Sequence, residues 1–319
     1  MTDAIRLTDV TKRFNGLTAV DRLTLTVPRG SIYGFIGPNG SGKTTTLRMI
    51  MNILLPDEGH IDVLDSSGGG PAPDARRPGR RPKAVAARDR VSYLPEERGL
   101  YKKMTVRRLL RYYGQLKGRS VADLDPQIAD WMSRMGMQGW DDKKIESLSK
   151  GMSQKVQFVA AVVSQPELLI LDEPFSGLDP VNAETLKDAV LEMRRRGATV
   201  VFSTHDMATA EKMCDRIFMI FRGRKVLDGT LHDIQAQYGF DTVRLRTSAG
   251  AVALSGIPGV DAVNDYGQLQ EVRLSCDAQR FLQQLAQRTP VHHFEITRPS
   301  LHDIFVRIAR PAAGEDASV

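Results

Sequence analysis

A glycine-rich loop that ends in Lys-Thr is the first group of residues able to do chemistry. It reads GPNGSGKT and lies between an apolar strand predicted at Ser31–Ile36 and an amphipathic helix. Glycines let successive backbone N–H groups converge on phosphate oxygens, and the start of a helix adds partial positive charge. Strand, loop, Lys-Thr and helix agree, which disfavours a simple tight turn. The predicted phosphate-binding residues are Gly37, Pro38, Asn39, Gly40, Ser41, Gly42, Lys43, Thr44 and Thr45.

Two adjacent carboxylates are the second such group. Asp172 and Glu173 follow the apolar run Leu168–Leu171, which is typical of a buried parallel strand. Asp172 can hold Mg²⁺ through water, while Glu173 can polarise a water in line with a γ-phosphate. Lys43 can reach the β- and γ-phosphates, and Thr44 can offer its hydroxyl to Mg²⁺. A carboxylate pair that only caps a strand is the alternative, but phosphoryl transfer needs both parts and both are present.

Apolar strands alternate with helices through the first 230 residues or so, which predicts a largely parallel sheet with ligands at the carboxyl ends of its strands. The helix after the loop buries Leu47, Ile50, Met51 and Leu54. Helices are expected over roughly Val106–Met137, from Ser149, and around Ala183–Arg196. The expected strands are Ile5–Val10, Leu23–Val27, Ser31–Ile36, Val91–Leu94, Leu168–Leu171 and Thr199–Ser203.

The pattern changes near Gln235–Phe240 and predicts a second, smaller domain. Its order of elements indicates a β-α-β-β-α-β sandwich in which the first helix is weakly patterned. The expected elements are strands Thr242–Thr247, Val260–Asp265, Glu271–Cys276 and Val291–Ile296, and helices Ala278–Gln287 and Ser300–Ile308.

Composition excludes several classes of protein. The 319 residues are 41% hydrophobic and contain no apolar run of the roughly 18 residues that a membrane span needs. The N-terminus lacks the basic start and apolar stretch of a signal peptide. Two cysteines cannot build a disulfide framework, which favours a reducing, cytoplasmic compartment.

Most of the net charge of +6 lies in one segment, residues 66–90, which holds seven basic and two acidic residues. Its mixture of Gly, Pro and Arg offers little to bury, so we expect a flexible, solvated loop without a partner. Weak contact with anionic lipid headgroups is the alternative. Nucleic acid comes last, because no aromatic residue in the segment could stack on a base.

With these motifs the chain resembles the ATP-binding cassette (ABC) ATPases. The signature motif matches LSKGM at 148–152, the D-loop matches SGLDP at 176–180, and the switch histidine matches His205 in STHD. Phe14 matches the aromatic residue that stacks on adenine. The motifs occur in the family's order over residues 5–232. The LSKG variant, the segment LPEERGLY at 94–101 and the additional C-terminal domain look like bacterial export ATPases of the sodium- and drug-efflux type.

The resemblance implies an α/β fold: a P-loop ABC ATPase cassette with a mostly parallel core sheet, an antiparallel β subdomain and a helical subdomain, plus a small α+β ferredoxin-like C-terminal domain. The expected limits are 1–234 for the ATP-binding domain, 66–90 for the basic insertion, 103–165 for the helical subdomain with the signature motif, 241–310 for the accessory domain and 311–319 for a disordered tail.

The resemblance also implies a head-to-tail homodimer, because the chain carries one P-loop. Ser149, Gly151 and Asp179 of one copy would then bind the nucleotide of the other, and His205 would contact the γ-phosphate. Two departures stand out. Glu96 occupies the place of the family's Q-loop glutamine, which puts a carboxylate near Mg²⁺, and Lys150 and Met152 replace a glycine and a glutamine of the signature.

The predicted function is the cytoplasmic, Mg²⁺-dependent ATPase of an ABC exporter. It would sit on the inner face of the membrane and power a separate permease through ATP-driven dimer closure. The alternatives are a soluble ABC-type ATPase, in translation or DNA repair, and a nucleotide-dependent scaffold not coupled to transport. The single P-loop and the lack of sustained heptads disfavour the first. Intact Lys43, Asp172, Glu173 and His205 disfavour the second.

Overall fold

The computed structural model describes residues 3–64, 66–67, 89–96, 99–238 and 242–309. It divides into two compact units, Met1–Asp228 and Gly229–Val319, and each unit has apolar core residues of its own. Most of the expected basic insertion and the tail at 311–319 lie outside the described residues. The domain limits drawn from the sequence therefore stay predictions.

A six-stranded sheet forms the centre of the first unit, with strand order β10-β9-β3-β8-β7-β6. Strands β9, β3, β8, β7 and β6 pair in parallel, as the alternation of strands and helices predicted. Strand β10 returns from β9 through a two-residue turn in which both residues have positive φ, the geometry of a tight antiparallel hairpin. The bounds are β3 Ile32–Ile36, β6 Val91–Leu94, β7 Leu168–Asp172, β8 Thr199–Thr204, β9 Arg216–Phe221 and β10 Arg224–Gly229.

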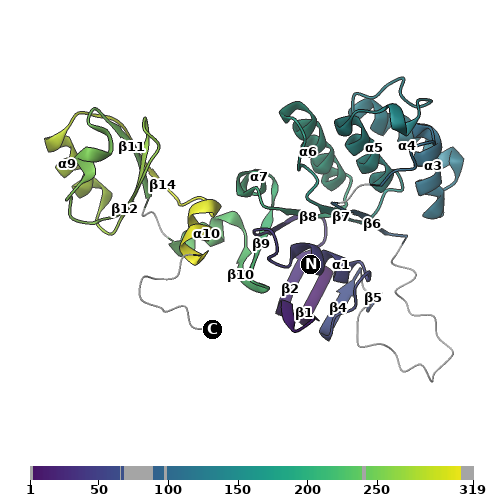
Figure 1. Cartoon of the computed structure of the whole chain (residues 1–319), viewed down its shortest axis with the longest axis horizontal. Helices are drawn as coiled ribbons and strands as arrows, with labels where there is room; N and C mark the ends of the chain where they lie inside the picture. The colour runs from purple at the N-terminus through teal and green to yellow at the C-terminus, as the bar shows by residue number, and fades with distance from the viewer. Residues whose placement is uncertain (1–2, 65, 68–88, 97–98, 239–241, 310–319) are drawn as a thin grey trace. The chain divides into compact units, whose positions relative to one another are not determined.

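Both faces of this sheet are covered, which is why its strands are almost continuously apolar. Alternate side chains enter two separate cores. Leu169 and Leu171 of β7 belong to the core beneath the helices α3 to α6, whereas Leu168 and Ile170 belong to the core shared with α1 and the antiparallel sheet. Figure 1 shows these two layers on opposite sides of the central strands.

The antiparallel sheet has the order β2-β1-β4-β5. Its strands are β1 Asp3–Phe14, β2 Leu17–Pro28, β4 Glu58–Val63 and β5 Ser66–Ser67. The first two are longer than the apolar cores predicted from the sequence, because cross-strand bonds continue into their polar ends. Strand β4 was not predicted, and β5 occupies the first two residues of the expected basic loop.

Helix α1, Lys43–Ile50, follows the glycine-rich loop. We predicted a helix that reached Leu54; this is wrong, because Asn52 takes a left-handed conformation with φ of 55° and ends the helical path. Leu47 and Ile50 are buried as expected, while Met51 and Leu54 pack against the same core from the following turn.

Two helices, α3 Val106–Leu116 and α4 Val121–Arg134, lie in the segment predicted at Val106–Met137, and α5 Lys150–Val162 is the helix predicted from Ser149. The side chains of Thr105, Ser120 and Ser149 cap their N-termini by accepting backbone N–H bonds. Two more helices follow, α6 Pro180–Arg195 and α7 Met207–Met213. Trp131 of α4 is fully buried and meets Phe158 of α5 edge to face.

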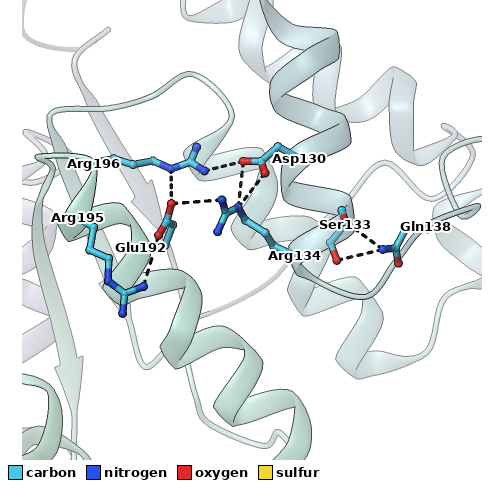
Figure 2. Close-up of polar contacts among 7 residues, drawn as sticks. All are labelled: Asp130, Ser133, Arg134, Gln138, Glu192, Arg195 and Arg196. Carbon is cyan, nitrogen blue, oxygen red and sulfur yellow. Dashed lines mark hydrogen bonds and ion pairs between the residues drawn. The ribbon is translucent and has the colours of Figure 1, made fainter.

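An ion-pair network joins the end of α4 to the end of α6, as Figure 2 shows. Asp130 accepts from Arg134 and from Arg196, and Glu192 accepts from Arg196 and lies 3.4 Å from Arg134. The Arg196 guanidinium also lies 4.8 Å from the centre of the Trp131 ring. The four charges form a closed ring above a buried aromatic side chain.

The second unit begins with α8 Leu231–Tyr238 and contains a four-stranded sheet of order β12-β13-β11-β14, with every neighbouring pair antiparallel. This order confirms the ferredoxin-like α+β class. The weakly patterned first helix is only the 3₁₀ turn η2. The bounds are β11 Thr242–Thr247, η2 Gly250–Leu254, β12 Val260–Asp265, β13 Gln270–Leu274, α9 Ala278–Arg288, β14 Val291–Thr297 and α10 Leu301–Ala309.

Candidate functional site: a phosphate cradle with two carboxylates

The glycine-rich loop joins the carboxyl end of β3 to α1. At two of its positions, the backbone conformation and the neighbouring atoms leave room only for glycine. Gly37 has φ of 157°, and a Cβ there would lie 2.3 Å from the carbonyl oxygen of Ile220. Gly42 has φ of 110°, and a Cβ there would lie 2.6 Å from the carbonyl oxygen of Ala19. Gly42 is also the N-cap of α1, and no side chain caps that helix. The first backbone N–H groups of α1 therefore remain for an anion.

The side chain of Lys43 points back into the glycine-rich loop. Its ammonium donates to the carbonyl oxygens of Gly37, at 2.7 Å, and Pro38, at 3.2 Å. It also lies 3.7 Å from Oε1 of Glu173. Burial lowers the pKa of Lys43, and the nearby carboxylates of Glu173, Asp172 and Glu96 act in the opposite direction. A phosphate at this position would add further negative charge beside the buried ammonium.

A cavity of about 230 Å³ opens at this point. It brings together the loop and the predicted acidic residues Glu96 and Glu173. Ala19, at the start of β2, forms part of its wall and was not predicted from the sequence. The lining residues are Ala19, Asn39, Gly40, Gly42, Lys43, Thr44, Thr45, Glu96 and Glu173.

Asp172 ends β7 and is buried, with 1% of its surface exposed. Among the described residues, the hydrogen bonds to its carboxylate come from neutral hydroxyls. Thr44 donates to Oδ1 at 3.2 Å and Ser203 donates to the same oxygen at 2.5 Å, while Tyr93 donates to Oδ2 at 3.3 Å. The side chain is thus oriented by groups that leave its negative charge in place.

Glu173 is the first residue after β7 and has a left-handed backbone conformation, with φ of 47°. Such a conformation is uncommon outside glycine and asparagine and is found where surrounding contacts enforce it. The backbone N–H of Glu173 donates to the hydroxyl of Ser203 at 2.9 Å. Its carboxylate lies between Lys43 on one side and His205 on the other, with Nδ1 of His205 3.1 Å from Oε2. His205 follows β8, and its side chain is 57% exposed.

The remaining predicted residues lie elsewhere. Ser149 is exposed and caps α5, and Asp179 is exposed and caps α6 by accepting from the N–H of Asn182. The signature segment packs against the D-loop and the start of α6, since a Cβ on Gly151 would lie 3.9 Å from Cδ2 of Leu178 and 2.8 Å from Nδ2 of Asn182. None of the described residues that line the cavity belongs to either segment.

Phe14 and Lys150 are also placed away from the cavity. Phe14 ends β1 with 42% of its surface exposed, and the ammonium of Lys12 lies 5.4 Å from its ring centre. Lys150 is exposed, and its ammonium lies 3.0 Å from where a Cβ on Gly177 would stand. It therefore lies over the D-loop of its own chain.

Two residues in contact with Asp172 were missed by sequence reasoning. Tyr93 lies in β6, three positions before Glu96. Ser203 lies in β8, two positions before His205. Both signals were present in the sequence as polar side chains near the ends of predicted buried strands. Burial raises the pKa of Tyr93 to about 12, and the neighbouring Asp172 adds to the effect, so the phenol stays a donor at neutral pH.

Known protein families match both units. Residues 20–176 match the family described as ABC transporter, and residues 229–309 match the ATP-binding protein DrrA1-3-like, C-terminal domain. The uncharacterised ABC transporter ATP-binding protein YhaQ of Bacillus subtilis is 37% identical over 299 residues, which are 93% of this chain and 95% of YhaQ. The Nod factor export ATP-binding protein I of Sinorhizobium fredii is 31% identical over 314 residues, 96% of this chain and 85% of that protein.

Solved structures of ATP-binding subunits of ABC transporters resemble this chain in fold. The ATP-binding subunit of an ABC transporter superposes with a TM-score of 0.65 at 30% identity, covering 74% of this chain and 93% of that one. A nucleotide-free ATP-binding cassette has a TM-score of 0.61 at 20% identity, covers 74% of this chain and 94% of that one, and shows the fold alone. None of the helices in the described ranges is long and apolar enough to cross a membrane. With a phosphate cradle, two carboxylates at the carboxyl end of β7 and these relatives, the chain belongs to the ATP-binding subunits of ABC transporters, a family of ATPases that bind ATP.

Proposed function

We propose that this chain is a Mg²⁺-dependent ATPase that works as a head-to-tail homodimer and powers a separate membrane permease of an exporter. One observation carries the chemical part: Lys43, Glu96 and Glu173 line the same cavity as the uncapped start of α1. Asp172 is bonded to Thr44 at its edge. A cradle for phosphate and a carboxylate for proton transfer therefore share one small volume.

The residues present fit a magnesium ion. The hydroxyl of Thr44 and the carboxylate of Asp172 lie 3.2 Å apart, and oxygen donors of these two kinds are those that Mg²⁺ prefers in nucleotide sites. Thr44, Asp172 and Glu96 would hold the ion, and its charge would polarise the phosphate oxygens when bound. Glu96 is exposed at the cavity wall, which leaves its carboxylate able to turn toward the ion.

Lys43, Glu173 and His205 have different roles toward the bound triphosphate. Lys43 and the loop N–H groups bind the β- and γ-phosphates. Glu173 acts as the general base, accepting a proton from the water that attacks the γ-phosphorus. His205 is hydrogen-bonded to that carboxylate and exposed on its other side, so its ring can contact the γ-phosphate while it orients Glu173.

The other predicted binding residues need a second copy of the chain. Ser149, Gly151 and Asp179 are at the starts of two helices, and the side chains of Ser149 and Asp179 are exposed. In the homodimer they would meet the nucleotide held by the partner's P-loop. Phe14, an exposed aromatic at the end of β1, supplies the face on which adenine would stack.

The coupling to transport rests on relatives. A Nod factor export ATP-binding protein matches nearly the whole length of this chain, which supports an exporter as the assembly. We place the protein on the cytoplasmic face of the membrane, held there by its permease; weak contact of the 66–90 segment with anionic lipid is the alternative to a segment without a partner. The second unit, which has its own apolar core, would stabilise or regulate the dimer.

Two experiments test the proposal. The purified full chain should hydrolyse ATP with Mg²⁺ and not with EDTA, and should do so faster when reconstituted with its multi-span permease, which is to be sought in the neighbouring reading frames. Absence of hydrolysis under both conditions would favour a nucleotide-dependent scaffold instead. A chain shortened after residue 234 that dimerised, hydrolysed ATP and supported transport at the parent rate would remove the role given to the second unit.

A further inference from the structure

Ser203 lies near the carboxyl end of β8, an interior strand of the sheet, beside the two acidic residues. It belongs to β8, which pairs in parallel with β7, and in that register Ser203 is the partner of Asp172. The residue is fully buried, with 0% of its surface exposed. Solvent therefore does not reach its hydroxyl in the folded chain.

The hydroxyl makes two different hydrogen bonds at once. It donates its proton to Oδ1 of Asp172 at 2.5 Å and accepts the backbone N–H of Glu173 at 2.9 Å. A serine hydroxyl has one donor and two acceptor positions, so both bonds form together. One oxygen atom thus holds the side chain of Asp172 and the backbone of Glu173.

The bond to Glu173 stabilises a conformation that the residue would not choose by itself. Its φ of 47° lies in the left-handed region, which disfavours residues with a Cβ. That conformation turns the chain sharply after β7 and lets the carboxylate lie near both Lys43 and His205. Without Ser203 the buried N–H would lose its acceptor, and the turn would relax toward other conformations.

The bond to Asp172 has a second consequence. A neutral hydroxyl orients the carboxylate without cancelling its charge, whereas an arginine or lysine at the same place would compete with a cation. Tyr93 and Thr44 act on Asp172 in the same way. The hydroxyl of Ser203 differs from theirs because it also bonds the neighbouring residue.

We propose that Ser203 is a positioning residue for ATP hydrolysis, whose hydroxyl sets the metal-binding carboxylate of Asp172 and the backbone turn of Glu173 relative to each other. The inference rests on the proposed Mg²⁺-dependent hydrolysis. It assigns Ser203 no contact with nucleotide, so its loss should disturb the geometry of the acidic pair and leave the phosphate cradle intact.

The test compares three variants of the full chain. Ser203→Ala removes the hydroxyl, and Ser203→Cys keeps a side chain of similar shape with weaker hydrogen bonding. Thr199→Val is the matched control, because Thr199 lies in the same strand, is 2% exposed and accepts the backbone N–H of Gly30 at 3.0 Å, away from the acidic pair. It deletes a buried hydroxyl with a comparable loss of one backbone bond.

Two readouts separate positioning from general stability. Steady-state kinetics should show kcat reduced about 10- to 100-fold in Ser203→Ala, with KM for ATP changed less than threefold, because small misplacements of reacting groups have effects of this size. Thermal unfolding should show that ATP with EDTA raises the Tm of all variants as it does the parent. The further rise on adding Mg²⁺ should shrink in Ser203→Ala and Ser203→Cys only.

The inference is overturned if Ser203→Ala keeps the parent kcat and the parent Mg²⁺-dependent rise in Tm, or if Thr199→Val loses both to the same degree. Should Ser203→Ala fail to fold, Ser203→Cys gives the same comparison. If the parent chain itself hydrolyses no ATP, the proposed function fails, but the Mg²⁺-dependent rise in Tm still tests the role of Ser203.

Discussion

The imidazole of His205 lies 3.1 Å from one carboxylate oxygen of Glu173, and the other oxygen of that carboxylate lies 3.7 Å from the ammonium of Lys43. A single buried carboxylate is therefore placed between a fixed cation and a partly exposed ring. The ammonium attracts one oxygen of this carboxylate and helps to fix its position. The ring limits the directions in which the carboxylate can turn, and Glu173 is one of the residues that line the cavity.

Glu173→Gln should abolish turnover without abolishing binding. Glutamine keeps the shape and the contact with His205 but cannot accept a proton from water, so kcat should fall by about 100-fold or more. Nucleotide binding, measured with a fluorescent ATP analogue, should stay within about threefold of the parent. With hydrolysis blocked, ATP should also convert the variant into a stable dimer that gel filtration detects.

The control for this prediction is Glu184→Gln, which removes a carboxylate that is 69% exposed and pairs with Lys187 on the surface of α6. It should hydrolyse ATP at the parent rate. Turnover by Glu173→Gln at that same rate would remove Glu173 from the role of general base.

His205→Ala should act through the same step as Glu173. Loss of the ring leaves the carboxylate less oriented and removes a contact to the γ-phosphate, so we expect kcat to fall by about 10- to 100-fold. Because the two residues touch, their effects should not add: the double variant with Glu173→Gln should be no slower than Glu173→Gln alone. Kinetics of the four proteins in this cycle measure the coupling. Fully additive losses would show that the two side chains act independently.

Local patterns made the phosphate cradle readable from the sequence. All of its glycines, Lys43 and Thr44 fall within eight consecutive residues, so chain connectivity alone brings them together. Strands of the second unit were predicted almost to the residue, as at Thr242–Thr247, because apolar and polar side chains alternate along a sheet with one buried face. In both cases the information lies in near neighbours.

Contacts that depend on the pairing of distant strands could not be predicted from the sequence in this way. Ser203 is 31 positions from Asp172 and Tyr93 is 79 positions from it, and both meet the carboxylate only because β6, β7 and β8 are aligned side by side. Strand β4 was missed because its sequence, EGHIDV, is mainly polar and is held by pairing with β1 rather than by its own propensity.

The raised pKa of Tyr93 predicts that the folded chain loses stability at alkaline pH. Its pKa is raised by burial to about 12 in the folded chain, above the value of about 10 for an unfolded tyrosine. Between these values the unfolded chain loses the proton and the folded chain keeps it, so unfolding is favoured as pH rises. The stabilisation is complete below pH 10 and disappears as pH passes 12.

The measurement is urea unfolding of the parent and Tyr93→Phe from pH 8 to 11. At pH 8 the variant should be less stable, because it lacks the hydrogen bond to Asp172, and the gap should narrow above pH 10. Tyr101→Phe, which changes a tyrosine that is 53% exposed, serves as the control and should leave the gap constant. A gap that stays the same for Tyr93→Phe as well would contradict the prediction.

Arg196 should contribute more to stability than an ordinary surface arginine. It bonds Asp130 of α4 at 2.6 Å and Glu192 of α6 at 3.0 Å (Figure 2). Its guanidinium also lies 4.8 Å from the ring centre of the buried Trp131. Burial alone would raise the pKa of Asp130, but the bonds from Arg196 and Arg134 outweigh it and hold that pKa below its usual value. Charges arranged in such a network, together with a cation–π contact, are worth more than isolated exposed pairs.

Arg196→Gln should therefore lower the free energy of unfolding by about 1–2 kcal/mol, and 1 M salt should reduce the difference by screening the ion pairs. Lys187→Gln is the control, because Lys187 pairs with the exposed Glu184 within one helix, and it should cost about 0.5 kcal/mol or less. Urea unfolding of both variants at low and high salt gives the comparison. The network explanation requires a larger and salt-dependent loss at Arg196, since equal losses at the two sites would mean that the closed ring between α4 and α6 adds nothing beyond a single surface pair.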